Sequence, residues 1–320
     1  MSTGATDAFA GTTLAELLGR LRILAGRSYT VSELGGGLTN RNYRVRTTDQ
    51  ESSGGREPGD YVVRVSTNSS GLLAIDRARE RYNTARAWEA GVGAPVIEAL
   101  PDADVLVVGF LQGRTLTAED VRDPTTIPRI ATAVRRLHSG PAFDGDFDMR
   151  QIRLRYLDIV TSHEFRLPDD YRDLETKVRG LEDAMAGHPE PLVPCNNDLL
   201  AGNFIDDTST MWIIDYEYSG MNEASFELGN IASESALDPG ALEALVSAYW
   251  GRESAAKVAR ARAWSLLARY GWTLWASIQA SVSAIDFDFW GWGMEKYESA
   301  RAELLGSAYP EILRGLEADN

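Results

Sequence analysis

Two short segments in the second half of the chain carry residues suited to transferring a phosphoryl group. One is a polar loop, NNDLLAGN at 196–203, and the other is the end of an apolar strand, IDYEYSG at 214–220. Kinases use an Asp, an Asn five residues later and an Asp at the end of the next strand. The pattern predicts that Asp198 takes the proton of the attacking hydroxyl and that Asn203 and Asp215 bind magnesium.

A glycine-rich turn far upstream can hold the phosphates of a nucleotide. GGGLTN at 35–40 lies between two strand-like runs, and glycine lets backbone N–H groups approach a phosphate closely. Such a hairpin alone is more often only a turn. Arg64 lies in an apolar strand, and a carboxylate on the next helix would orient it toward phosphates, although spacing alone favours a solvated Glu80. The nucleotide-binding residues predicted here are Gly36, Gly37, Thr39, Asn40, Arg64 and Glu80.

Tryptophans gather near the C-terminus. Five of the eight lie between 264 and 292, with Asp286 and Asp288 among them. Trp272 and Trp275 share one helix face, where aromatic residues are usually core. The alternative is a box of ring faces that binds a cation, and the interspersed carboxylates favour it modestly.

The elements that position these residues fall into two parts. Strands are expected at 28–34, 42–48, 61–66, 94–100 and 104–110, with helices at 12–25 and 72–90 and a polar loop at 49–59. After Gly113 we expect helices at 117–138 and 165–186, two short strands at 191–195 and 211–216, and an almost wholly helical segment from 224 onward. The fold class is therefore α+β, with a small β-rich N-lobe at 1–110 and a larger helical C-lobe at 111–320.

Composition excludes several other classes of protein. The formal net charge of −15 disfavours nucleic acid and anionic membranes as partners, although acidity most often serves solubility alone. No apolar run is long enough to span a membrane, and the N-terminus lacks the pattern of a secretion signal. The single Cys195 excludes a disulfide within one chain, so a cytoplasmic protein is expected. His138, His163 and His188 show no spacing typical of a zinc site.

At these motifs the chain resembles the choline/ethanolamine kinase branch of the aminoglycoside phosphotransferase-like kinases, particularly the bacterial choline kinases. The resemblance runs from GGLTNRNYRV at 36–45 to about residue 300, and the run at 271–289 is its most specific part. It implies a protein-kinase-like bilobal fold, ATP and Mg²⁺ as cofactors, and Arg64 in the position of the protein-kinase lysine, with Glu80 as its partner. The chain departs from the family at Asn196, where a His is usual, and at Glu227, where an Asp is usual.

The resemblance also assigns further residues to the site. The hinge at 105–114 would hold adenine, through a segment that includes Phe110 and Gln112. The residues expected to contact the acceptor are Asp198, Glu217, Glu234, Trp272, Trp275 and Trp292.

The function expected from the resemblance is transfer of the ATP γ-phosphoryl group to a small cationic alcohol, choline or ethanolamine. Two alternatives stay open: a kinase for another amine or a sugar such as an aminoglycoside, and a nucleotide-binding pseudokinase. The sequence leaves monomer and homodimer equally open.

Overall fold

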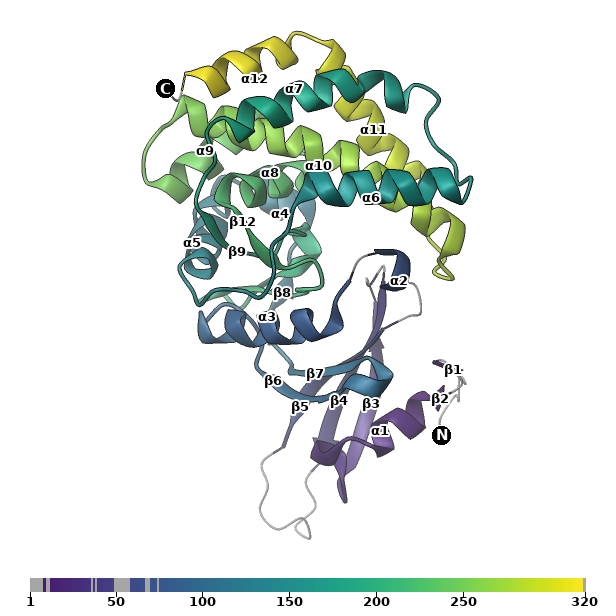
Figure 1. Cartoon of the computed structure of the whole chain (residues 1–320). Coiled ribbons are helices and arrows are strands. Elements are labelled where there is room, and N and C mark those ends of the chain that lie inside the picture. The colour runs from purple at the N-terminus through teal and green to yellow at the C-terminus, as the bar shows by residue number, and fades with distance from the viewer. Residues whose placement is uncertain are drawn as a thin grey trace.

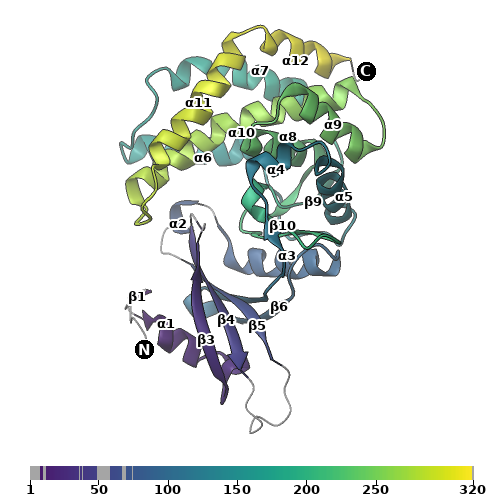
Figure 2. The ribbon, with the colours of Figure 1, turned by 180° about the vertical axis from the view of Figure 1, so that it is seen from behind.

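A computed structural model shows a sheet-rich part and a helical part, joined by a short segment near residue 110 (Figure 1). The structure describes residues 8–9, 12–35, 37, 39–48, 58–66, 70–73 and 75–318. The expected loop at 49–59 lies almost wholly outside these residues. Figure 2 shows the same arrangement from behind, with α3 between the sheet and the helical part.

Five antiparallel strands form the N-terminal sheet, in the order β3-β4-β5-β7-β6. Valines alternate along them, and the inward-facing ones, such as Val63 and Val65, are fully buried. The strands confirm the sequence prediction closely. Their bounds are β3 (Ser28–Leu34), β4 (Asn40–Thr48), β5 (Asp60–Ser66), β6 (Val96–Leu100) and β7 (Val105–Gly109), with the 3₁₀ helix η2 (Pro101–Ala103) between the last two.

The N-terminal helix is shorter than predicted. The sequence suggested one helix over 12–25, but α1 (Leu14–Gly19) ends early and the 3₁₀ helix η1 (Arg22–Leu24) follows. Leu21 between them is extended, and its side chain is buried against the sheet. Before α1, the short strands β1 (Ala8–Phe9) and β2 (Thr12–Thr13) pair with each other. Thr13 and Glu16 then form a capping box that fixes where α1 begins.

The helix predicted over 72–90 is two helices, α2 (Ser70–Leu73) and α3 (Arg77–Glu89). Asp76 is extended and its carboxylate accepts the N–H groups of Ala78 and Arg79, so it caps α3 at its N-terminus. This cap places Glu80 in the first turn of α3, where its side chain is buried.

Helical predictions between 113 and 186 needed three corrections. The single helix over 117–138 is α4 (Ala118–Arg122) and α5 (Ile127–His138), because Asp123 is extended and binds the Thr125 N–H. The helix over 165–186 is only η3 (Tyr171–Leu174) and α7 (Glu175–Ala186). Helix α6 (Met149–Ser162) was not predicted at all. Its Arg153 hides the apolar pattern, since it is buried in ion pairs with Glu175 and Glu182.

Short strands support the loop that carries the predicted catalytic residues. β9 (Leu192–Cys195) pairs with β12 (Gly220–Glu223), and β10 (Phe204–Asp206) lies between β11 (Met211–Ile213) and β8 (Arg114–Thr115). The 3₁₀ helix η4 (Ala201–Asn203) leads into β10. The strand predicted over 211–216 ends at Ile213, so Asp215 lies beyond it.

The C-terminal helices confirm the prediction for 224 onward. They are α8 (Ala224–Ser235), α9 (Pro239–Trp250), α10 (Ala255–Val282), α11 (Phe289–Leu305) and α12 (Ala308–Glu317). The long α10 is the centre of the main core and packs against α6, α8, α11 and α12 (Figure 1). In the described part of the chain, every helix is too short or too polar to cross a membrane.

Helices α8 and α10 meet at Gly229, which yields a test of the packing. A Cβ at this position would overlap the carbonyl oxygen of Ala261 and approach the Ser265 nitrogen to 2.8 Å. Gly229→Ala should therefore lower the free energy of unfolding by about 2 kcal/mol or more. Gly19→Ala is the control, because nothing lies within 4 Å of its Cβ position. Equal stability of both variants in urea titrations would contradict this close packing.

Candidate active site

The loop at 196–203 is held by hydrogen bonds within itself and to the strand that follows. The Asn196 side chain accepts the Asp198 N–H and donates to the backbone oxygens of Ile214 and Asp215, the latter over 2.8 Å. The Asn203 amide nitrogen donates to the Asp198 carbonyl over 2.7 Å, and the Ile214 N–H donates to the Asn203 carbonyl. These bonds bring Asp198, Asn203 and Asp215, the three predicted catalytic residues, together and fix their relative positions.

Glu227 on α8 anchors the start of this loop. Its two carboxylate oxygens accept the backbone N–H groups of Asn196 and Asn197 over 2.9 and 2.8 Å. Both bonds are buried, and hydrogen bonds to a charged acceptor are the stronger kind. Both Glu227 and Asn196, where the family usually has Asp and His, therefore take part in the hydrogen bonds that hold the loop.

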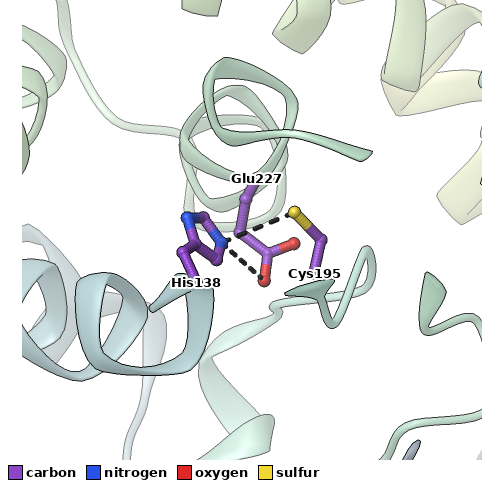
Figure 3. A group of neighbouring side chains, drawn as sticks. All are labelled: His138, Cys195 and Glu227. Atoms are coloured by element: carbon purple, nitrogen blue, oxygen red, sulfur yellow. Dashed lines mark hydrogen bonds and ion pairs between the residues drawn. The ribbon is translucent and has the colours of Figure 1, made fainter. Parts of the chain in front are cut away.

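Behind Glu227 lies a buried group that the sequence gave no sign of. Figure 3 shows His138 from α5 and Cys195 from β9 pointing toward Glu227. The His138 Nε2 atom lies 3.8 Å from a Glu227 oxygen and 3.5 Å from the Cys195 sulfur, although 57 residues separate His138 from Cys195. The expected spacing for a zinc site was absent from the sequence, yet the fold brings these three possible ligand types together.

The chemistry of this group favours packing over metal binding. Burial and then the charge of Glu227 raise the pKa of the Cys195 thiol well above its usual value, whereas a metal ligand must be a thiolate. Both Glu227 oxygens already accept loop N–H groups, and His138 Nδ1 is within 2.8 Å of the Tyr249 hydroxyl. We therefore assign this group to the support of the loop.

Arg64 joins the sheet to the predicted metal-binding residue. Its guanidinium lies 2.9 Å from Glu80, 3.0 Å from Asp215 and 2.9 Å from Glu217. The sequence predicted the pairing with Glu80 but not the other two contacts. Burial lowers the pKa of Arg64, and the charges of Asp215, Glu80 and Glu217 outweigh it and raise the pKa above its ordinary value.

Arg77, which the sequence analysis missed, completes this charge cluster. It lies 2.7 Å from Glu80 and 3.2 Å from Glu217, and it donates to the Asn40 side-chain oxygen. Thr39 and Asn40, from the end of the glycine-rich turn, donate to the two Glu217 oxygens over 2.6 and 2.9 Å. Glu217 thus connects the predicted nucleotide residues to the segment that follows Asp215. Gly36 lies outside the described residues, and Gly37 lines the same cavity as Asp198.

Asp215 has an unusual backbone and an unusual electrostatic environment. Its φ of 64° is in the left-handed region, which Asp tolerates better than most residues. The backbone therefore turns at Asp215 and does not continue the extended conformation of the strand. Burial raises its pKa to about 6, against the lowering effect of Arg64. A divalent cation bound to the carboxylate would reverse that shift, since it favours the charged form.

Asp198 shares the cavity with three other carboxylates. Burial raises its pKa well above the usual value, followed by the charges of Glu234, Asp215 and Glu217, while Lys296 lowers it. Four carboxylates therefore face one region, and the pKa of the predicted base responds to each of the others. A metal ion and a cationic substrate would both stabilise its ionised form.

A small cavity of about 60 Å³ connects the loop to the tryptophans. Asp198, Asn203 and Asp215 line one part of it, and Glu234 with three tryptophans lines another. The complete lining is Gly37, Thr39, Asp198, Leu200, Asn203, Asp215, Glu217, Tyr218, Glu234, Trp272, Trp275 and Trp292. All six predicted acceptor residues thus meet at one cavity. A larger cavity of about 500 Å³ lies between β5 and α3 and includes only Arg64 and Glu80 of the predicted residues.

The rings on the cavity wall are fixed by contacts with one another. Trp275 packs against Trp292 with 5.5 Å between ring centroids, and its indole N–H donates to the Tyr218 hydroxyl. Trp272 packs edge-on against Tyr218, and its buried Nε1 has no hydrogen-bond partner among the described residues. By contrast, Trp264 donates to Glu223, and Trp290 stacks on Arg166. Two of the five clustered tryptophans therefore lie away from the cavity.

Phe110 and Gln112 lie at the junction between the two parts of the molecule. Arg44 stacks on the Phe110 ring at 3.5 Å, and Gln112 donates to Asp60. Both side chains contact the sheet, and neither lines the cavity at Asp198. If this segment binds adenine, its backbone groups would make the contacts, as the family resemblance implied for the hinge.

The fold and the site together define a small-molecule kinase with a protein-kinase-like architecture. The family model for choline/ethanolamine kinase matches residues 31–244, so the chain belongs to the choline/ethanolamine kinase family. It is accordingly a phosphotransferase that acts on an alcohol.

Individual relatives agree with this assignment. A probable ethanolamine kinase of Arabidopsis thaliana is 25% identical over 309 residues, which are 86% of this chain and 79% of that protein. A crystal structure of a choline/ethanolamine kinase family protein from Mesorhizobium loti superimposes with a TM-score of 0.80 at 29% identity, covering 94% of this chain and 97% of that one. The choline kinase LicA from Streptococcus pneumoniae shares the fold, with a TM-score of 0.75, 23% identity and coverage of 91% and 98%. A crystal structure of a LicA protein in complex with AMP also shares the fold, with a TM-score of 0.71 at 23% identity.

Glu227 offers a direct test of how the loop is held. Glu227→Gln turns one oxygen into an N–H donor that faces a backbone N–H, which should cost about 1–3 kcal/mol in unfolding free energy. The same change should lower kcat about tenfold or more, because the displaced loop carries Asp198.

Glu98→Gln is the matched control for this change. Glu98 is also buried and also accepts two backbone N–H groups, those of Arg22 and Ile23, but it lies on β6. Glu98→Gln should lower the free energy of unfolding and leave kcat unchanged. If both variants keep the wild-type kcat, the loop does not depend on Glu227.

Proposed function

We propose that this protein transfers the γ-phosphoryl group of ATP to the hydroxyl of a small cationic amino alcohol, choline or ethanolamine, with Mg²⁺ as cofactor. The observation that carries the proposal is the shared cavity, in which the catalytic carboxylates and the aromatic rings face the same space. Membership of the choline/ethanolamine kinase family supports the reaction class.

In this proposal Asp198 orients the acceptor hydroxyl and takes its proton as the new O–P bond forms. Its raised pKa makes it a stronger base than an exposed Asp, provided that it is ionised when the acceptor is bound. Positive charge close by, from the acceptor and the metal, favours that ionised form.

Asn203 and Asp215 are the proposed Mg²⁺ ligands, and the donor set fits the ion. Magnesium prefers oxygen ligands and usually takes one or two from the protein. The Asn203 nitrogen is held by the Asp198 carbonyl, so the amide presents its oxygen to a cation. When bound, Mg²⁺ would neutralise charge on the phosphate oxygens.

On the nucleotide side, Arg64 and Glu80 are proposed to act near the phosphates, together with Gly36, Gly37, Thr39 and Asn40. Thr39 and Asn40 are tied to Glu217, which keeps the end of the glycine-rich turn beside the catalytic loop. The hinge near Phe110 and Gln112 would bind adenine. We place the boundary between the lobes there, with the N-lobe at 1–110 and the C-lobe at 111–320. The need for ATP is consistent with a cytoplasmic location.

The acceptor's ammonium group is proposed to lie among Trp272, Trp275 and Trp292, with Glu234 nearby. Ring faces attract cations by up to roughly 2 kcal/mol when the contact is desolvated. Two of these rings are almost fully buried, and their partners hold them in place.

The test of this function is an assay of ADP release with Mg²⁺, ATP and a panel of acceptors. The panel contains choline, ethanolamine, thiamine, homoserine and an aminoglycoside. We expect turnover with choline or ethanolamine, and Asp198→Ala should lower kcat by about a thousandfold because the base is lost. Turnover only with the aminoglycoside would reassign the acceptor, and none above the variant's background would indicate a pseudokinase.

The aromatic wall gives a second prediction. Trp272→Leu keeps an apolar side chain but removes the ring face, so the KM for the amino alcohol should rise about tenfold while the KM for ATP stays unchanged. Trp264→Leu is the control, since this ring lies outside the cavity and donates to Glu223. Equal acceptor KM values in the two variants would exclude a role for Trp272 in cation binding.

A further inference from the structure

The acceptor cavity has a cation of the protein's own next to it. Lys296 on α11 places its ammonium 2.8 Å from both oxygens of Glu234, and the two side chains are 9% and 4% exposed. The same ammonium lies 4.3 Å from the centre of the Trp292 ring. Lys296 and Trp292 are one helical turn apart, so they share a face of α11.

Lys296 contacts Glu234 but is not part of the cavity wall. Glu234 and Trp292 line the cavity, whereas Lys296 does not. The charge of Glu234 is thus paired before an acceptor arrives, and each of its oxygens already accepts a hydrogen bond. Burial raises the pKa of Asp198 most; the charge of Glu234 also raises it, and the charge of Lys296 lowers it.

The remaining carboxylates of the cavity are also engaged. Asp215 and Glu217 lie 3.0 and 2.9 Å from Arg64. Asp198 is the proposed base and must face the hydroxyl. Near the rings, Trp272 Nε1 is buried without a hydrogen-bond partner among the described residues, and an indole N–H can only donate.

A primary ammonium and a trimethylammonium group need different partners at such a site. A primary ammonium carries N–H donors, and burying them without acceptors is costly. A trimethylammonium group has no N–H donor, and aromatic ring faces satisfy it. We propose that Lys296, by pairing with Glu234, makes this site select a quaternary ammonium alcohol over a primary one. The inference rests on the proposed amino-alcohol kinase function and narrows its substrate to choline-like acceptors.

The proposal is tested by the ratio of kcat/KM for choline to kcat/KM for ethanolamine. The wild-type protein should favour choline. Lys296→Met frees the Glu234 carboxylate, so the ratio should shift about tenfold toward ethanolamine, chiefly through a lower KM for ethanolamine. Lys296→Arg keeps the charge and should keep the wild-type ratio. The KM for ATP should stay constant throughout.

Three controls separate this role from a purely structural one. Lys177 on α7 stacks on Tyr309 of α12, and neither residue lines the cavity. Lys177→Met should therefore leave the ratio unchanged. The uncharged isostere of choline, with a tert-butyl group in place of trimethylammonium, should react equally in wild type and Lys296→Met. In the double variant Glu234→Gln/Lys296→Met no carboxylate is freed, so the ratio should return to the wild-type value or beyond it.

The outcomes distinguish this inference from the function beneath it. If the wild type phosphorylates either alcohol but Lys296→Met leaves the ratio within about twofold, or moves it toward choline, the role of Lys296 is overturned. The same holds if the double variant accepts ethanolamine as well as Lys296→Met does. If no variant phosphorylates either alcohol, the proposed function fails and the inference falls with it. Should Lys296→Met not fold, Lys296→Gln removes the positive charge while its amide can still donate to Glu234, so the ratio should shift in the same direction by a smaller factor.

Discussion

The arrangement of this site depends on one buried cation, the guanidinium of Arg64. It contacts Glu80 on α3 and both Asp215 and Glu217 in the segment after β11, so a single side chain links the sheet to the helical part. Removing a charge from water is expensive, and it is offset only when several partners with good geometry surround it. Arg77 shares two of these carboxylates, which keeps positive and negative charge close to balance. A planar guanidinium suits this role, because it can contact several carboxylates at once.

Glu227 supports the loop at 196–203 through two buried hydrogen bonds. The loop's N–H groups are drawn to that carboxylate, and His138 and Cys195 close the space behind it (Figure 3). Asn196 then bridges to the segment that carries Asp215. The two departures from the family pattern are thus adjacent in space and bonded to each other. A longer acid at 227 and a shorter polar residue at 196 together maintain the loop.

Much of this was visible in the sequence, where local rules apply. The order Asp198, Asn203, Asp215 indicated the chemistry because kinase roles are tied to one loop and one strand end, and the valine-rich strands were predicted closely. The predicted helix boundaries were wrong where a single polar side chain decides them, as at Asp76 and Asp123. Helix α6 was not predicted, because Arg153 is buried although a charged residue in a sequence usually indicates the surface. Arg77, Lys296 and the His138–Cys195 contact could not be predicted, since each joins residues that only the folded chain brings together.

The carboxylate loop and the tryptophan wall are proposed to serve one reaction on one amino alcohol. The most direct test of this proposal is to identify the product formed from ATP, Mg²⁺ and a mixture of choline and ethanolamine, by phosphorus NMR or mass spectrometry. We expect a phosphomonoester of the amino alcohol in an amount equal to the ADP released, and no such product with Asp198→Ala. Release of ADP with inorganic phosphate alone, or the same product yield from the variant, would contradict the proposal.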